Sequence, residues 1–271
     1  MQTSSPRNRQ QGAALLLMML VVLVAATTIL VTRLDLNQMR TERLTDSQAA
    51  LSLARDALID YATVRPDLAP GSPAMLPCPD IDASGGLLEG ETHTAGCGAP
   101  GVTGMGRLPW RTLGVAPLKD SSAACLWYVV SGSYKDAGAA TASLINPDSN
   151  GQLQLLGIEL GTIIAGQQPD ERPVAMIIAP MPALNGQARP GPASAGDQCS
   201  GSFAASRFLD TDAGSGVSNA SLAGVVDGLD LLAMAAGYDP EHNDRVAVIT
   251  RADLARRVQE RHDFDATIGA L

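Results

Sequence analysis

The chain has 271 residues, enough for one large domain or two small ones with a buried core. Hydrophobic residues make up 45% of it, which excludes a disordered chain, and aromatic residues only 3%, so the core must be mainly aliphatic. There are 19 lysine and arginine residues against 28 aspartate and glutamate residues. The net charge of −9 argues against a nucleic-acid-binding protein, whose surface would be basic.

The first distinctive segment is an uncharged apolar run over residues 13–31. A helix of 19 residues spans about 28 Å, close to the thickness of a bilayer, so the run predicts a transmembrane part over residues 13–32. Arg7 and Arg9 precede it without an acidic residue. The positive-inside rule therefore predicts a cytoplasmic N-terminus and a translocated remainder.

Three kinds of segment share this pattern: a cleaved signal peptide, a plain membrane anchor and a prepilin leader. The apolar region of a signal peptide is about 7–15 residues, so this run is long for that class. Gly12 closes a short polar leader over residues 1–12, and the apolar run begins at once with Ala13. This arrangement favours a prepilin leader, which is cut before the apolar run, and the plain anchor is the main alternative.

A long helix is predicted to continue beyond the apolar run, because no glycine or proline occurs between Gly12 and Pro66. Apolar side chains in its later turns fall on one helical face: Leu51, Ala54, Leu58 and Tyr61. We therefore expect one helix of about 50 residues, whose periplasmic part over residues 33–65 packs on a domain. The alternative is two helices joined near Arg33.

Residues 7–20, RNRQQGAALLLMML, followed by this long helix, resemble the N-terminal signature of the type IV pilin-like superfamily. That superfamily comprises type IV pilins, minor pilins and the pseudopilins of type II secretion. The resemblance covers about the first quarter of the chain. It implies cleavage between Gly12 and Ala13 by a prepilin peptidase, methylation of the new N-terminus, and assembly with other pilin or pseudopilin subunits through the N-terminal helix.

One position departs from the family pattern. Family members usually carry a glutamate at the fifth residue of the mature chain, where this sequence has Leu17. In the family, that glutamate pairs with the N-terminal amine of a neighbouring subunit, which a leucine cannot do. The large pseudopilin at the tip of type II secretion filaments shares the lack. The resemblance therefore implies a minor component of tip or initiation type.

Residues 66–271 are predicted to form a pilin-like periplasmic globular domain. Four cysteines in a translocated chain predict two disulfides, for which three pairings exist. The favoured pairing joins Cys78 to Cys97 across a short loop, and Cys125 to Cys199 across distant parts of the domain. The absence of a CxxC pair or a cysteine–histidine cluster in the sequence argues against zinc.

A motif between the first two cysteines matches part of the calcium-loop template. Its candidate oxygen ligands are Asp80, Asp82, Ser84 and Glu91. A hard cation prefers several oxygens, and a glycine follows Ser84 where the loop must turn sharply. Pro79 and Gly90 argue against flanking helices, so the alternative is a solvated acidic turn. Calcium is the cofactor that the sequence suggests.

Short apolar runs bounded by turn residues predict strands over 125–131, 153–160, 174–179 and 245–250. Thr250 and Asp253 predict the start of a helix, and the alanine-rich stretch 221–236 predicts another short one. The predicted fold class is α+β: a long N-terminal helix, membrane-spanning in its first half, packed on an antiparallel-sheet domain with disulfides.

No enzyme signature stands out. Residues 96–101 formally match a dinucleotide-binding motif but lack a preceding strand. The sequence therefore predicts a non-enzymatic minor pilin or pseudopilin of a type IV pilus or a type II secretion filament. Its expected place is the bacterial inner membrane, as a single-pass protein with a periplasmic domain. The expected partners are the prepilin peptidase, other subunits and inner-membrane lipid. The alternatives are a membrane-anchored periplasmic binding module outside any filament and a periplasmic enzyme.

Overall fold

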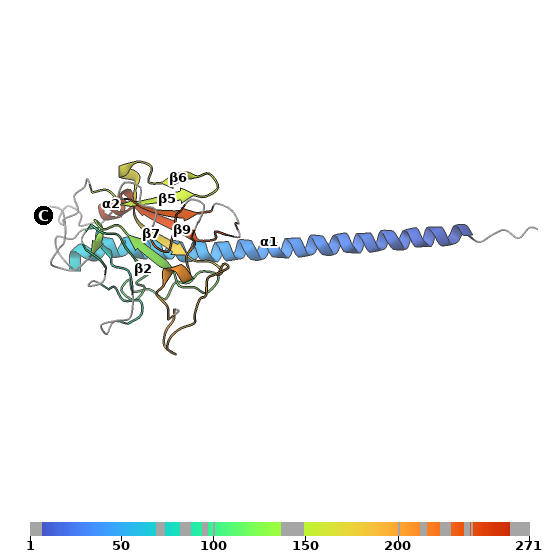
Figure 1. Ribbon diagram of the computed structural model, residues 1–271, viewed down its shortest axis with the longest axis horizontal. Coiled ribbons are helices and arrows are strands. Elements are labelled where there is room, and N and C mark those ends of the chain that lie inside the picture. Colours follow the sequence, from blue (N-terminus) through green and yellow to red (C-terminus); the bar gives the residue numbers. More distant parts are fainter. Residues whose placement is uncertain are drawn as a thin grey trace, which may run out of the picture. The chain divides into compact units, whose positions relative to one another are not determined.

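The computed structural model describes residues 7–68, 74–81, 88–93, 97–99, 101–136, 149–199, 201–211, 216–222, 229–235, 239 and 241–260. The chain divides into two units, Met1–Thr45 and Asp46–Leu271. One helix, α1 (Arg7–Leu68), contributes to both units (Figure 1). Its 62 residues continue through Arg33 and end two residues after Pro66. The prediction of one long helix is confirmed, and the alternative of two helices is wrong.

The apolar part of α1 does not meet the requirement for a membrane span. Across the described residues, no helix combines the length and apolarity that crossing a membrane requires. The predicted transmembrane part over 13–32, the membrane-spanning first half of the fold and the single-pass inner-membrane localisation are therefore wrong.

The later turns of α1 belong to the second unit and bury one face. The buried residues recur every three or four positions, as a single face requires: Ser47, Ala50, Leu51, Ala54, Leu58, Ile59 and Ala62. The predicted apolar stripe is confirmed at Leu51, Ala54 and Leu58, whereas Tyr61 is half-buried.

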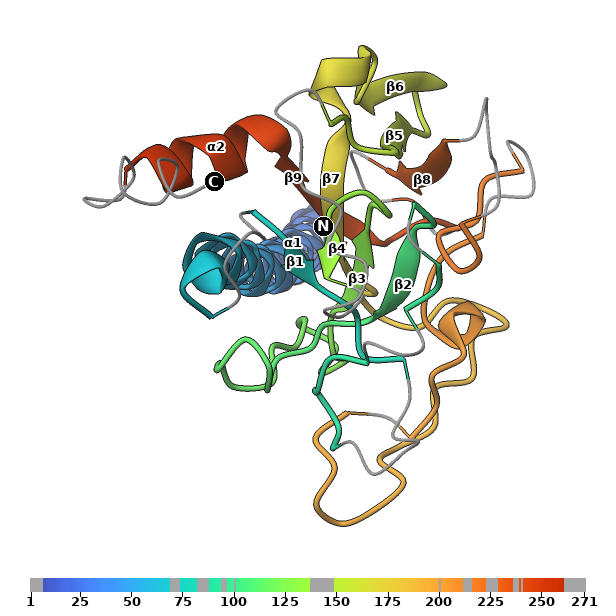
Figure 2. The same ribbon diagram turned by 90° about the vertical axis from the view of Figure 1, so that its left-hand side faces the viewer.

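A four-stranded antiparallel sheet forms the centre of the second unit (Figure 2). Its strands, in spatial order, are β2 (Gly104–Arg107), β3 (Trp127–Val130), β7 (Pro173–Ala179) and β9 (Arg245–Thr250). Every residue of β7 is buried, so both faces of the sheet are covered there. The predicted strands 125–131, 174–179 and 245–250 are confirmed, the last at both ends.

Two smaller sheets contain parallel pairs. One has the order β6 (Thr162–Ala165), β5 (Leu153–Gly157) and β8 (Asp230–Met234), with β5 and β8 parallel. The other pairs β1 (Leu76–Pro77) with β4 (Lys135–Asp136), also in parallel.

The predicted antiparallel sheet is confirmed for the central sheet, whereas the parallel pairs of the two smaller sheets were not predicted. The helix expected over 221–236 is wrong where β8 forms. Pairing with β5 buries the middle of β8 and outweighs its alanine- and leucine-rich helix propensity.

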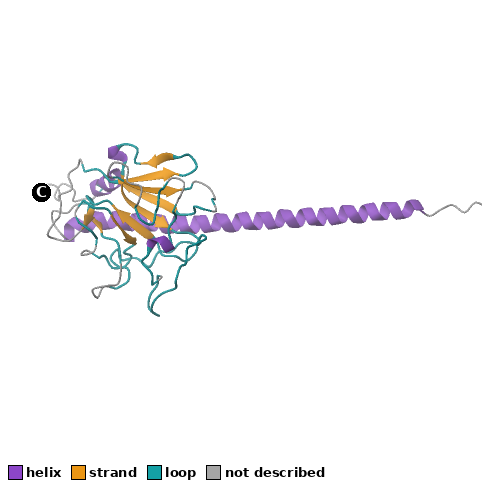
Figure 3. Ribbon diagram, viewed as in Figure 1, coloured by secondary structure: helices purple, strands orange, loops and turns teal. Residues whose placement is uncertain are grey.

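The main core lies between the two larger sheets. It includes Trp127 and Val129 from β3, Met176 and Ile178 from β7, and Leu155 from β5. Figure 3 shows that long loops join these strands, and short 3-10 helices, η3 (Pro169–Glu171) and η4 (Ala205–Arg207), lie within them.

The last described helix, α2 (Arg251–Gln259), begins where the sequence predicts. Asp253 Oδ2 accepts the Thr250 N–H at 3.0 Å, and the Asp253 N–H donates to Thr250 Oγ1 at 3.3 Å. These reciprocal bonds satisfy two backbone donors at the helix start, as a capping box does.

Two disulfides join the loops of the second unit, Cys78–Cys97 and Cys125–Cys199. These are the pairs that the sequence favoured.

Candidate functional site

The most unusual surface of the first unit is the apolar stretch of α1 over residues 15–29. Its eleven large apolar side chains are between 55% and 73% exposed. The polar groups within it are satisfied locally, because Thr27 Oγ1 and Thr28 Oγ1 donate to the Val24 carbonyl at 2.9 Å and 2.5 Å. A continuous exposed surface of this kind is typical of a protein–protein contact, since soluble monomers rarely leave such a patch uncovered.

The residues expected to control processing and assembly lie in or beside this stretch. Leu17 is 64% exposed and forms part of the apolar surface. Gly12 and Ala13 lie in the helical backbone of α1, but their side chains fall outside the described set. Cleavage between these two residues therefore stays a prediction.

The structure describes only part of the predicted calcium loop, because Asp82 and Ser84 lie outside the described residues. Asp80 is buried, and its Oδ2 atom accepts the Gly90 N–H at 2.8 Å. Glu91 Oε2 accepts the Leu88 N–H at 2.9 Å. Among the described residues, no group of three or more histidine, cysteine or acidic side chains is placed to hold a metal. Calcium binding stays a prediction.

Glu89, which the sequence did not single out, connects this loop to a distant one. Its two carboxylate oxygens accept the N–H groups of Gln198 and Cys199 at 2.7 Å and 2.8 Å. Arg107 Nη1 lies 3.8 Å from Glu89 Oε1. These partners are far apart in sequence and follow no local motif, so only the folded structure reveals the contact.

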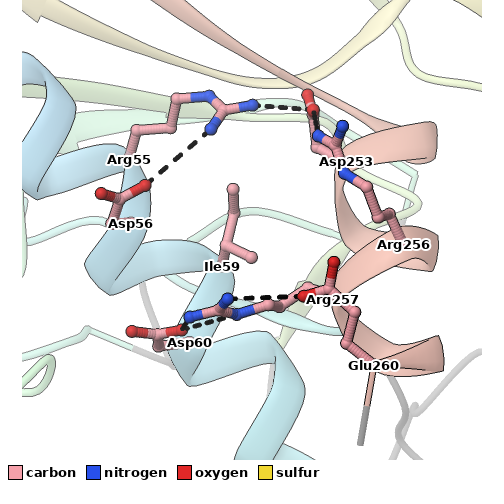
Figure 4. A pocket seen from close by; sticks show the side chains of 8 residues that line it. All are labelled: Arg55, Asp56, Ile59, Asp60, Asp253, Arg256, Arg257 and Glu260. Atoms are coloured by element: carbon pink, nitrogen blue, oxygen red, sulfur yellow. Dashed lines mark hydrogen bonds and ion pairs between the residues drawn. The ribbon is translucent and has the colours of Figure 1, made fainter.

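A charged groove of about 310 Å³ lies between the later turns of α1 and α2 within the second unit (Figure 4). Arg55 Nη2 pairs with Asp253 Oδ1 at 2.7 Å, and Arg257 Nη2 pairs with Asp60 Oδ1 at 3.0 Å. The Ile59 side chain lies between these two pairs. Each of these ion pairs joins a side chain of α1 to a side chain of α2. The groove therefore serves to attach α2 to α1.

The same contacts shift the acidity of Asp253. Burial acts to raise its pKa, but the hydrogen bonds from Thr250 and Arg55 together hold the pKa of this carboxyl below its usual value. Asp253 therefore stays ionised and both caps α2 and pairs with α1.

A second acidic feature is the buried pair Asp210 and Asp244. Asp244 Oδ2 accepts the Asp210 N–H at 2.8 Å and the Asn219 Nδ2–H at 2.9 Å, while Asp210 Oδ2 accepts the Asp244 N–H at 2.7 Å. Burial, reinforced by the neighbouring Asp210 charge, raises the pKa of Asp244 well above its usual value. The hydrogen bonds of this pair hold two loops together. Because the pKa of Asp244 is raised, this carboxyl resists ionisation.

No protein-family model, curated protein or solved structure matches this chain. An assignment of function therefore depends on the residues and geometry described above. The arrangement combines a covered, disulfide-linked second unit with an uncovered apolar helix surface in the first.

Proposed function

We propose that this protein is a structural subunit of a type IV pilin-like filament, with no catalytic role of its own. In detail, it is a minor pilin or pseudopilin of a type IV pilus or a type II secretion machine. The observation that carries the proposal is the exposed apolar surface of α1 over residues 15–29, in the same helix whose later turns are buried in a folded unit.

The energetics of this surface favour assembly through helices. Burying one large aliphatic side chain contributes about 1.5–3 kcal/mol, so covering several of them yields a stable contact. Apolar residues occur on every side of the helix in this stretch, which suits contact with several neighbouring helices at once. Other subunits of the filament, each with an apolar N-terminal helix, are the partners that fit this chemistry.

Leu17 supports a place at the tip or at initiation. A leucine at this position offers no charge to the N-terminal amine of another subunit, so contact there depends on packing alone. A subunit of this type needs to match neighbours on one side only, and we expect it in few copies. The processing enzyme would be a prepilin peptidase that cuts between Gly12 and Ala13.

Processing in the native host tests the class of protein. We expect intact mass and N-terminal sequencing to show a mature chain that begins at Ala13 with a methylated amine. The variant Gly12→Glu should keep its leader, because the expected cut follows that glycine, whereas the control variant Gln10→Ala should be processed normally. A mature N-terminus at Met1 or near Thr27 would contradict the proposal.

A further inference from the structure

A second cavity, of about 240 Å³, lies beside the Cys125–Cys199 disulfide in the second unit. Three cationic side chains line it, namely Arg107, Lys119 and Arg189. Its lining also includes two aromatic rings, of Trp127 and Phe208, but no aspartate or glutamate among the described residues. This composition is unexpected in a chain with a net charge of −9 and only two lysines, Lys119 and Lys135.

Several contacts hold one side of the cavity in place. Arg189 Nη2 donates to the carbonyls of Pro180 and Phe208 at 3.1 Å and 2.9 Å, and Arg189 Nη1 donates to the Met181 carbonyl. The disulfide and two prolines, Pro190 and Pro192, restrict the backbone conformations of the loop that follows Arg189.

Asp120 fixes the segments around Ser122 and Met181 beside the cavity. Its Oδ1 atom accepts the N–H groups of Ser122 and Ala124 at 2.8 Å and 3.0 Å, and its Oδ2 atom accepts the Met181 N–H at 2.6 Å. Both oxygens of this acidic neighbour are thus occupied by backbone donors. A cavity with walls this constrained is preformed, which lowers the entropic cost of binding a ligand.

The cations retain unused hydrogen-bonding capacity. Arg107 is 3% exposed, and among the described residues its Nη1 atom and the Nε atom of Arg189 have no hydrogen-bond partner. Three acidic residues, Asp80, Glu89 and Asp197, act on the Arg107 charge. Glu89 Oε1 lies 3.8 Å from Arg107 Nη1, and both Glu89 oxygens already accept backbone N–H groups. Lys119 forms no ion pair with any residue that the structure describes, and its side chain is half-buried.

We propose that this cavity binds a small amphipathic carboxylate, with its apolar body against Trp127 and Phe208 and its carboxylate beside Lys119 and the two arginines. Charge-assisted hydrogen bonds make arginine and lysine the usual partners of carboxylates. The aromatic wall favours an anion with an apolar body over inorganic phosphate, which would gain nothing from it. The volume is below that of cavities for drug-sized ligands, so the ligand is about the size of one aromatic ring with its carboxylate. This inference is independent of the filament proposal.

Calorimetric titration of the full chain, with both disulfides oxidised, tests the proposal with benzoate as the probe. We expect saturable binding that weakens with added salt, as screening of partly exposed charges requires. Benzamide, which has the same shape without the charge, should bind at least about tenfold more weakly, and so should inorganic phosphate. The proposal would be overturned by no detectable binding of benzoate at millimolar concentration, or by equal binding of either competitor.

A matched pair of variants locates the site. Lys119→Met removes one cation from the cavity and should weaken benzoate binding at least about tenfold. Arg207→Met removes an exposed cation on η4, outside the cavity, and should bind benzoate like the wild type. Urea unfolding of both variants shows whether each is folded, so that the binding affinities of folded proteins are compared. Equal affinities of the two folded variants would place the probe elsewhere and overturn the proposal.

Discussion

Two stretches of α1 meet opposite environments. Over residues 15–29 every described side chain is exposed, including Leu17 at 64% and Leu20 at 63%. In the later turns, Leu58 is fully buried and Leu51 is 5% exposed. Both stretches are rich in leucine, but only the second places its apolar residues on one face. Hydrophobic pattern, rather than hydrophobic content, therefore decides which part of the helix folds onto its own chain and which part stays available for another.

The largest effect should come from the longer disulfide of the second unit. The double variant Cys125→Ser/Cys199→Ser should lower the free energy of unfolding by about 2–5 kcal/mol, because the unfolded chain regains the freedom of a long loop. The double variant Cys78→Ser/Cys97→Ser should cost about 1 kcal/mol less, since its sequence separation is 19 against 74. Urea unfolding measures both values. Equal stability of the wild type and the first variant would contradict the prediction.

A pair of leucine truncations compares the two stretches directly. Leu58→Ala should lower the free energy of unfolding by about 2–5 kcal/mol, because it leaves a cavity in a packed core. Leu20→Ala should change it by less than about 0.5 kcal/mol in the isolated subunit, where that side chain is already exposed. Similar losses for both variants would show that residues 15–29 are buried within the subunit itself.

A smaller, pH-dependent effect is expected at Asp244. Because its folded pKa is raised, the folded protein holds this proton more tightly than the unfolded chain. The resulting stabilisation is complete below the unfolded pKa and is lost as pH rises through the folded pKa. Asp244→Asn, which cannot ionise, should therefore gain stability relative to the wild type as pH is raised from acid to neutral. The exposed control Asp170→Asn should follow the wild-type profile. Parallel profiles for wild type and Asp244→Asn would contradict this account.

Features set by local pattern could be predicted from the sequence. The strand over 245–250 and the cap at Thr250 follow from short-range propensity. The disulfides are not local, but the number and spacing of the cysteines favoured the two pairs that the structure forms. Features set by tertiary contacts could not. The β8 strand depends on parallel pairing with β5, and the cations of the second cavity come from three separate loops and strands with no shared motif.

The transmembrane prediction is wrong for a different reason. The apolar run over residues 13–31 predicts a span from its length, but among the described residues no helix combines the length and apolarity that crossing a membrane requires.

The smallest effect is expected at Leu17. If the protein occupies a tip-type position, Leu17→Glu should leave its incorporation into filaments unchanged or reduce it, because no neighbouring amine is there to pair with the new carboxylate. The ratio of this subunit to the major subunit, measured by quantitative mass spectrometry of purified filaments, should be low for the wild type and no higher for the variant. A marked increase for Leu17→Glu, or wild-type protein as the predominant subunit, would contradict the tip position.

Site-specific photo-cross-linking in the native host tests most directly whether other subunits cover the apolar surface of α1. Benzoylphenylalanine placed at Leu20 should form adducts with the N-terminal helix of another filament subunit, identified by mass spectrometry. The control position is Leu53, which is also an exposed leucine of α1, at 59%, but belongs to the second unit. The account predicts subunit adducts at Leu20 and few or none at Leu53. No subunit adduct at Leu20, or equal yields at the two positions, would contradict it.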